Sequence, residues 1–240
     1  MKRHERVGPV TAGIGTWVLW AIVVIAAGVI AAWAVPWGGV KAPAWAPAGG
    51  QIVIPEAAAR QIAALRIGEK QGRESYRRDR FGAPWFDEDH NGCDTRNDVL
   101  RRDLDHPVMK GHEGCVVARG TLHDPYTGRD IEFIAGKDSR RVQIDHVVAL
   151  ADAWSSGARD WPNERRRAFA NDPENLLAVD GPANEEKGAD DAAAWLPPNI
   201  PFRCPYVLRQ ARVKARYGLS VTEAERSAML ATLGDCQGTG

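Results

Sequence analysis

Two stretches of the chain decide its fold: QIDHVVAL at residues 143–150 and NDPENLLAVDGPANEEKG at residues 171–188. In the first, a β-branched run surrounds an Asp-His pair, which predicts a strand that carries His146 near its end. In the second, a short apolar run begins at Asn175 and leads into a helix with further polar residues. We therefore expect two strands and a helix to bring the polar side chains of both stretches together.

These polar residues suit the hydrolysis of a phosphodiester bond, which needs a base, a cation and rigid placement of both. His146 is the candidate base, because imidazole titrates near neutral pH. Asp145 and Asn184 offer the hard oxygen ligands that Mg²⁺ prefers, with Mn²⁺ as the alternative. Asn175 is expected to hydrogen-bond the loop bearing His146, and Lys187 to contact a phosphate oxygen. His146, Asn175 and Lys187 are thus the candidate catalytic residues.

The pattern Asp-His…Asn…Asn-x-x-Lys-Gly resembles the ββα-metal finger of HNH endonucleases. A wider match supports this: YRRDRFGAPWFDEDHNGCDTRNDVLRRDL, the hairpin after it, IDHVVALADAW and FANDPENLLAV resemble secreted proteins with a GmrSD-type carboxy-terminal domain. The resemblance covers residues 74–236 and implies an HNH nuclease fold, a divalent metal and the residue roles given above. Residue 149 departs from it, being Ala where the commoner HNH form has Pro, which should alter the loop and not the chemistry.

These patterns predict a metal-dependent endonuclease with nucleic acid as substrate and DNA favoured over RNA; no partner protein is indicated. Two other interpretations stay open. In one, the domain is a catalytically inactive envelope domain that binds calcium or a partner, with Asp145 and Asn184 as turn residues. In the other, it is a toxin-like nuclease that acts on other cells. An Asp-His pair alone is weak evidence, whereas the joint spacing is much more specific.

The composition excludes some classes of protein. With 240 residues, 44% hydrophobic and 26% charged, the chain as a whole is neither disordered, collagen-like nor a coiled coil. Lys plus Arg and Asp plus Glu each number 31, and a net charge of zero argues against a protein that coats nucleic acid by charge alone. This zero is the sum of 3 − 1 = +2 in residues 1–40 and 28 − 30 = −2 in residues 41–240.

The amino-terminal segment predicts attachment to a membrane. Residues 12–35 form an apolar run of 24 residues, which as a helix would be about 36 Å long and could cross a bilayer. Basic residues precede it, so residues 1–11 are predicted to be a cytoplasmic tail and the rest to lie outside the cell membrane. The alternative is a signal peptide cleaved near Ala32-Trp33-Ala34, which would leave a secreted protein.

Residues 36–73 are expected to form a linker rich in Pro, Gly and Ala, ending with a short helix over 55–65. Residues 74–240 are predicted to be one α+β domain, with a ββα-metal core, added helices and a β-hairpin. Strands are predicted over 115–122, 129–134, 142–148 and 175–179, and helices over 99–104, 149–156, 162–170, 184–195, 207–217 and 222–233.

All four cysteines lie in the part of the chain predicted to be exported, which favours two disulfides. Four cysteines allow three pairings, and we expect the sequential one, Cys93–Cys115 and Cys204–Cys236. Each bridge would stabilise the fold by about 3 kcal/mol. No CxxC motif occurs, which argues against a zinc cluster.

The acidic segment DEDHNGCDTRND is a second candidate metal site. Asp87, Asp89 and Asn91, with Asp98 at the twelfth position, follow the spacing of a calcium-binding loop. Asp in place of the usual Glu at the twelfth position predicts weak affinity. The alternative is an acidic surface turn held by Cys93.

Several basic clusters are candidates for contacts with phosphate groups. If they share one face, they would form a track whose binding to nucleic acid depends strongly on salt. The alternative for each cluster is a solvated face that pairs with nearby acids. The favoured contacts are Arg77, Arg78, Arg140 and Arg141, and further clusters lie at 165–167 and 209–216.

Overall fold

The computed structural model describes residues 55–111, 114–136 and 138–236. The predicted tail and membrane segment, residues 1–35, lie outside these ranges. Among the described residues, no helix has both the length and the apolar character needed to span a bilayer.

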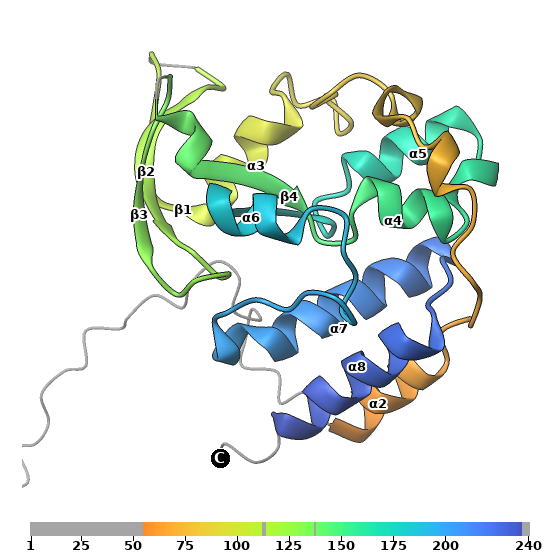
Figure 1. Cartoon of the computed structure of the whole chain (residues 1–240). Helices are drawn as coiled ribbons and strands as arrows, with labels where there is room; N and C mark the ends of the chain where they lie inside the picture. Colours follow the sequence, from red (N-terminus) through yellow and green to blue (C-terminus); the bar gives the residue numbers. More distant parts are fainter. Residues whose placement is uncertain (1–54, 112–113, 137, 237–240) are drawn as a thin grey trace, which may run out of the picture. The chain divides into compact units, whose positions relative to one another are not determined.

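Two small antiparallel sheets with helices packed around them confirm the predicted α+β class (Figure 1). One sheet has the order β1-β2-β3, and the other pairs β4 with β5. The strands are β1 (Leu104–Met109), β2 (Val117–His123), β3 (Asp130–Ile134), β4 (Val142–His146) and β5 (Leu176–Asp180). The α-helices are α2 (Pro55–Ala63), α3 (Thr95–Asp103), α4 (Leu150–Ser155), α5 (Asn163–Ala170), α6 (Gly181–Lys187), α7 (Ile200–Tyr217) and α8 (Glu223–Asp235).

Strands β4 and β5 and helix α6 form the strand–strand–helix unit that the sequence predicts. The register places His146 opposite Leu176, and all of β5 is buried because α3 and α6 pack against this sheet. Helix α6 begins at Gly181, where a Cβ atom would lie only 2.2 Å from the carbonyl oxygen of Arg140, so this position requires glycine. The helix ends at Lys187, since Gly188 adopts φ +53°. The helix predicted over 184–195 was therefore wrong in its bounds.

Strand β1 was not predicted, because its sequence LDHPVM contains a proline, which cannot donate to a strand ladder. The pairing of β1 with β2 is irregular between Asp105 and Val108. At this irregularity His106 has φ +47°, and the proline sits beside it. The bulge thus allows an unfavourable sequence to complete the three-stranded sheet.

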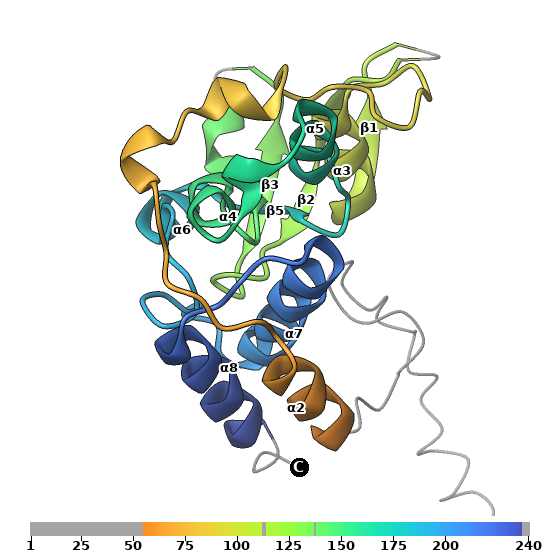
Figure 2. The same cartoon turned by 90° about the vertical axis from the view of Figure 1, so that its right-hand side faces the viewer.

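Helices α2, α7 and α8 lie side by side in both views (Figures 1 and 2). Ala58, Ile62 and Leu65, in and after α2, are buried in the same apolar cluster as Val207 and Met229 of the other two helices. The segment predicted as part of a linker therefore belongs to the core of the domain, which begins before residue 74. By the usual area relation, burying each large aliphatic side chain stabilises the fold by about 1.5–3 kcal/mol.

Both predicted disulfides are formed. Cys93 is bonded to Cys115, which joins the loop before α3 to the segment before β2. Cys204 is bonded to Cys236, which joins the first turns of α7 to the end of α8. Helix α8 also begins as predicted, since the Thr222 hydroxyl accepts a hydrogen bond from the backbone of Glu225.

Candidate functional site

A cavity of about 370 Å³ lies where β4, α6 and the loops before α3 meet. The predicted site residues Asp145, His146 and Asn184 all line it, as do Arg78, Trp85, Arg96, Gln143, Ile144, Ala149, Leu150, Glu185 and Gly188. A second cavity of about 230 Å³ shares Arg78, Trp85, His146 and Leu150 with the first. The two stretches that decide the fold therefore contribute to one concave site.

His146 is held in a single neutral form at the wall of both cavities. Its Nε2 lies 2.8 Å from the carbonyl oxygen of Ala170, and because a carbonyl can only accept, Nε2 carries the proton. The other nitrogen, Nδ1, is then a proton acceptor. Burial lowers the pKa of His146 to about 3, an effect that the charges of Arg78 and Lys187 strengthen and the Ala170 hydrogen bond opposes. The ring also stacks on Trp85, with 11° between the planes and 6.4 Å between centroids.

Asn175 fixes the loop that follows His146. Its side-chain oxygen accepts from the backbone N–H of Val148 at 2.8 Å, and its side-chain nitrogen donates to the Val148 carbonyl at 3.2 Å. The backbone carbonyl of Asn175 accepts from Val147. The side chain is completely buried, so losing these bonds would leave polar groups unsatisfied. The hydrogen bonds are those expected from the sequence, while the contribution of Asn175 to catalysis stays a prediction.

Lys187 lies in a position different from the one predicted. Its ammonium group is fully buried and donates to Asp145 Oδ1 at 2.9 Å and to the carbonyl of His146 at 3.0 Å. The hydroxyl of Tyr126 donates to Asp145 Oδ2 at 2.5 Å. The phosphate contact predicted for Lys187 does not fit this arrangement, because the ammonium faces the carboxylate inside the protein. Lys187 instead neutralises Asp145 and braces the end of β4.

Asp145 and Asn184 nevertheless suit a hard cation. Burial raises the pKa of Asp145, with Lys187 and Tyr126 acting against the rise. A carboxylate has about four lone-pair positions and two are used here, so Asp145 keeps acceptor capacity on the cavity wall. Asn184 uses its amide nitrogen to donate to Gln143 at 2.8 Å, which leaves its oxygen for another partner. Carboxylate and amide oxygens in a cavity with room for water are a donor set that Mg²⁺ accepts.

Of the four predicted phosphate contacts, one forms an ion pair with an acid and three form none with a described residue. Arg77 forms an ion pair with Asp79, at 2.5 Å, on an exposed surface. Arg78 lines both cavities, and Arg140 and Arg141 are exposed next to β4. The basic residues at 165–167 and 209–216 instead contact other groups of the protein. Arg166 and Arg209 donate to backbone carbonyls, and Arg165 stacks on Trp161. The others form ion pairs with acids: Arg167, Arg212, Arg216 and the buried Lys214.

The acidic loop of the candidate calcium site is organised around Asn91. The backbone N–H of Asn91 donates to Asp87 at 3.1 Å and to Asp89 at 3.2 Å, and its side chain donates to Asp98 at 3.1 Å. Arg101 pairs with Asp98 at 2.6 Å. The predicted residues thus converge around Asn91, with Asp98 contributed by the first turn of α3, and calcium binding stays a prediction.

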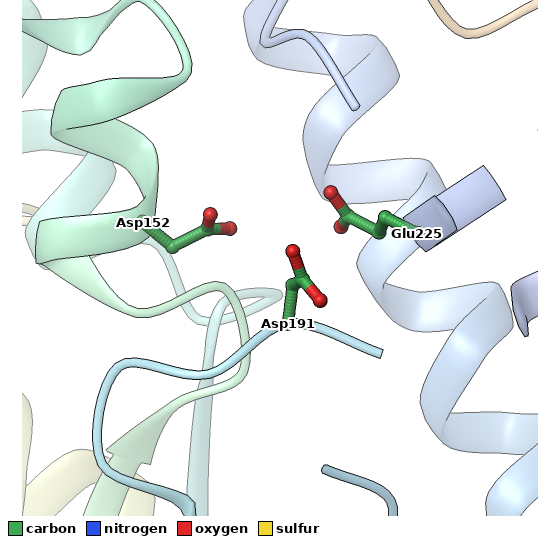
Figure 3. Close-up of side chains that lie close together, drawn as sticks. All are labelled: Asp152, Asp191 and Glu225. Atoms are coloured by element: carbon green, nitrogen blue, oxygen red, sulfur yellow. The ribbon is translucent and has the colours of Figure 1, made fainter. Parts of the chain in front are cut away.

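A different acidic cluster has the spacing of a metal site: oxygens of Asp152, Asp191 and Glu225 lie within 4.8 Å of one another, and their carboxylates point together (Figure 3). Two lysines fill this cluster. Lys70 pairs with Asp152 at 2.5 Å and with Asp191, and Lys214 pairs with Asp152 at 2.8 Å and with Glu225. These ammonium groups supply the positive charge that a metal would otherwise provide. We call these five residues the lysine–carboxylate network.

The sequence did not identify several residues of the site. Tyr126 and Gln143 orient Asp145 and Asn184, and Trp85 and Arg96 also line the cavity. Trp85 and Arg96 lie in the stretch that resembles the GmrSD-type domain, and this resemblance is the one sequence feature that could have pointed to them. Tyr126 lies in a turn after β2, and its sequence context does not predict a role in the site. Its contact with Asp145 depends on the three-dimensional fold.

Comparison with known proteins gives two findings. The family model for the C-terminal domain of GmrSD restriction endonucleases matches residues 94–232. An "Uncharacterized secreted protein" of Arthroderma benhamiae is 37% identical over 187 residues, which cover 76% of this chain and 87% of that protein. No solved structure matches. The secreted relative and the two disulfides fit a location in an oxidising compartment. Because the family model spans more than half of the sequence, the chain belongs to the family of GmrSD restriction endonuclease C-terminal domains.

Proposed function

We propose that this protein is a metal-dependent endonuclease that hydrolyses phosphodiester bonds of nucleic acid, with DNA as the favoured substrate, outside the cytoplasm. The observation that carries the proposal is His146, which is neutral, oriented through Nε2 and exposed to a cavity that also holds Asp145 and Asn184. Membership of a restriction endonuclease domain family points to the same chemistry.

The residues would act as follows. His146 Nδ1 takes a proton from a water molecule while the water oxygen bonds to phosphorus, the P–O bond to the leaving group breaks, and the leaving oxygen is protonated by solvent. Asn175 keeps the loop after His146 in place through Val148. Asp145 and Asn184 would hold the divalent cation. When bound, Mg²⁺ or Mn²⁺ would stabilise negative charge on the phosphate and on the leaving oxygen.

The alternative of an inactive domain is favoured by one observation, the ion pair between Lys187 and Asp145, which already neutralises the carboxylate. In that case the fold would persist without a metal. An assay of cleavage distinguishes the two functions, since an inactive domain leaves the substrate intact with any divalent ion.

The test uses the full-length chain, purified in detergent, with plasmid DNA or a labelled RNA and with Mg²⁺, Mn²⁺ or EDTA. Wild type should cleave with metal, and His146→Ala should lose about 10²- to 10⁴-fold in rate, the usual range for general base catalysis. His123→Ala, on the exposed side of β2, is the matched control and should cleave like wild type. Equal cleavage by His146→Ala would reject the mechanism, and an inert wild type would favour the inactive domain.

A further inference from the structure

Arg96 is the cation in the cavity that the sequence did not single out. It lies in the first turn of α3 and lines the cavity in front of His146. Its guanidinium lies 5.9 Å from the ring centroid of Trp85, whose indole stacks on His146. Arg96, Trp85 and His146 therefore form a continuous wall of the site.

The hydrogen-bonding groups of Arg96 are mostly unused. A guanidinium has five N–H donors, and within the described ranges Arg96 makes one weak hydrogen bond, to the Val142 carbonyl at 3.3 Å. The charge of Asp94 acts on Arg96, but the Asp94 carboxylate accepts from the backbone and side chain of Asn97 and caps α3. No ion pair joins Arg96 to any residue that the structure describes.

A half-buried cation without an acidic partner is costly, since desolvation is not repaid by an ion pair. Most arginines elsewhere in the described domain avoid this cost through carboxylates or carbonyl groups, as Arg167 does with Glu88 and Arg209 with the carbonyls of residues 173–176. Arg78, the other arginine of the cavity, donates a hydrogen bond to the Tyr76 hydroxyl but forms no ion pair with a described residue, and its charge acts on His146. Two guanidinium groups that have no acidic partner among the described residues, beside one proton acceptor, suit a ligand that carries negative charge.

The acids on the cavity wall do not take these cations. Asp145 is bound by Lys187 and Tyr126, and Glu185 accepts from Gln143 at 2.8 Å. The cavity therefore presents oxygen ligands from β4 and α6 together with the guanidinium groups of Arg78 and Arg96, neither of which has an acidic partner among the described residues.

We propose that Arg96, with Arg78, binds the phosphate group of the substrate in the cavity in front of His146. The planar guanidinium fits two phosphate oxygens at once. Trp85 serves as the platform that holds Arg96 and His146 at a fixed separation. This inference rests on the proposed function, because it names residues that position the substrate of the same site.

The first test measures binding without cleavage. The full-length chain carrying His146→Ala is titrated into a fluorescein-labelled DNA duplex in EDTA, and the anisotropy gives Kd at several salt concentrations. Adding Arg96→Gln should weaken binding about 10–100-fold, the value of a charged hydrogen-bonded contact, and reduce the salt slope by about 1. Arg96→Lys should bind with intermediate affinity. Arg119→Gln, which removes an exposed charge from β2 outside both cavities, is the control and should change Kd by less than about 3-fold.

Two further measurements separate failure of this inference from failure of the proposed function. Urea unfolding of Arg96→Gln checks that the variant folds, and inorganic phosphate titrated with wild type should raise the unfolding temperature, an effect that Arg96→Gln abolishes. If DNA and phosphate depend on Arg96 but wild type never cleaves with metal, the anion site stands and the endonuclease does not. If Arg96→Gln binds DNA as Arg119→Gln does and phosphate stabilises both equally, the role of Arg96 is overturned, even if cleavage is observed.

Discussion

Two clusters of charged side chains in this domain differ in whether their charges are compensated by neighbouring side chains. In the lysine–carboxylate network, every carboxylate oxygen except Glu225 Oε2 has a partner, and both lysines are shared between acids. In the cavity before His146, Arg78 and Arg96 have no acidic partner among the described residues. This difference supports the proposal that the second cluster binds a ligand, whereas the ion pairs of the first cluster are already complete within the fold.

Removing a lysine from the lysine–carboxylate network should give the largest effect and tests whether this network stabilises the fold. Lys214→Met leaves the buried Glu225 without its lysine partner and Asp152 with Lys70 alone, so the free energy of unfolding should fall by about 3–5 kcal/mol. Urea denaturation followed by circular dichroism measures this. Lys110→Met, at an exposed position after β1, is the matched control and should change stability by less than about 0.5 kcal/mol. A small effect of Lys214→Met would show that the network contributes little to the fold.

A pH titration sharpens the same comparison. Glu225 is fully buried beside Asp152 and Asp191, and burial raises its pKa to about 7 despite the attraction of Lys214. The folded state thus binds this proton more tightly than the unfolded state, whose carboxyl titrates near 4.5. The stabilisation is complete below about pH 4.5 and is lost as pH rises through about 7.

Glu225→Gln keeps the side chain neutral and should flatten this dependence. The measurement is the difference in unfolding free energy between wild type and Glu225→Gln at pH 5 and pH 8, which cancels the titration of other groups. Wild type should lose stability relative to the variant as pH increases. Parallel curves would mean that Glu225 has an ordinary pKa and that the network is balanced differently.

The acidic loop before α3 lies between the two clusters in how far its charges are compensated. A ligand bound there should give the smallest of the effects predicted here. Its carboxylates are bound mainly by N–H groups of the loop itself and by Arg101, with no buried lysine to neutralise them. Calcium should therefore bind weakly, with a Kd of about 10⁻⁴–10⁻³ M as in extracellular modules.

Calorimetry of the full-length chain checks this, with Asp89→Asn expected to abolish the heat and Asp190→Asn expected to retain it. Absence of heat in wild type up to several millimolar calcium would identify the loop as an acidic turn without a metal role.

Sequence reasoning predicted the parts of the fold that depend on local pattern. The apolar runs predicted β4 and β5, and the turn at residues 124–128 predicted the hairpin of β2 and β3. The capping residue Thr222 predicted the start of α8. It failed where the fold overrides local preference, as at Pro107 in β1, and where a helix stops at a glycine, as at Gly188.

The candidate site shows the same limit. Asp145, His146 and Asn184 were predicted together because their spacing alone implies two strands and a helix. Lys187 pairs with Asp145, which lies 42 positions earlier in the chain. Whether Lys187 points inward to Asp145 or outward to a ligand depends on which side of α6 faces the core. The wall formed by Trp85 and Arg96 comes from the loop before α3 and from the first turn of that helix, so no spacing could associate it with His146.

Trp85 adopts φ +56°, a left-handed backbone that costs a residue with a large side chain about 1–2 kcal/mol. Glycine would remove that cost, yet it would also remove an indole that packs against a buried apolar cluster and contacts Arg96 and His146. Because burial of a large side chain is worth about 1.5–3 kcal/mol, the contacts of Trp85 offset the strain of its backbone. A designer who replaced Trp85 to relieve that strain should therefore lose both stability and one wall of the cavity.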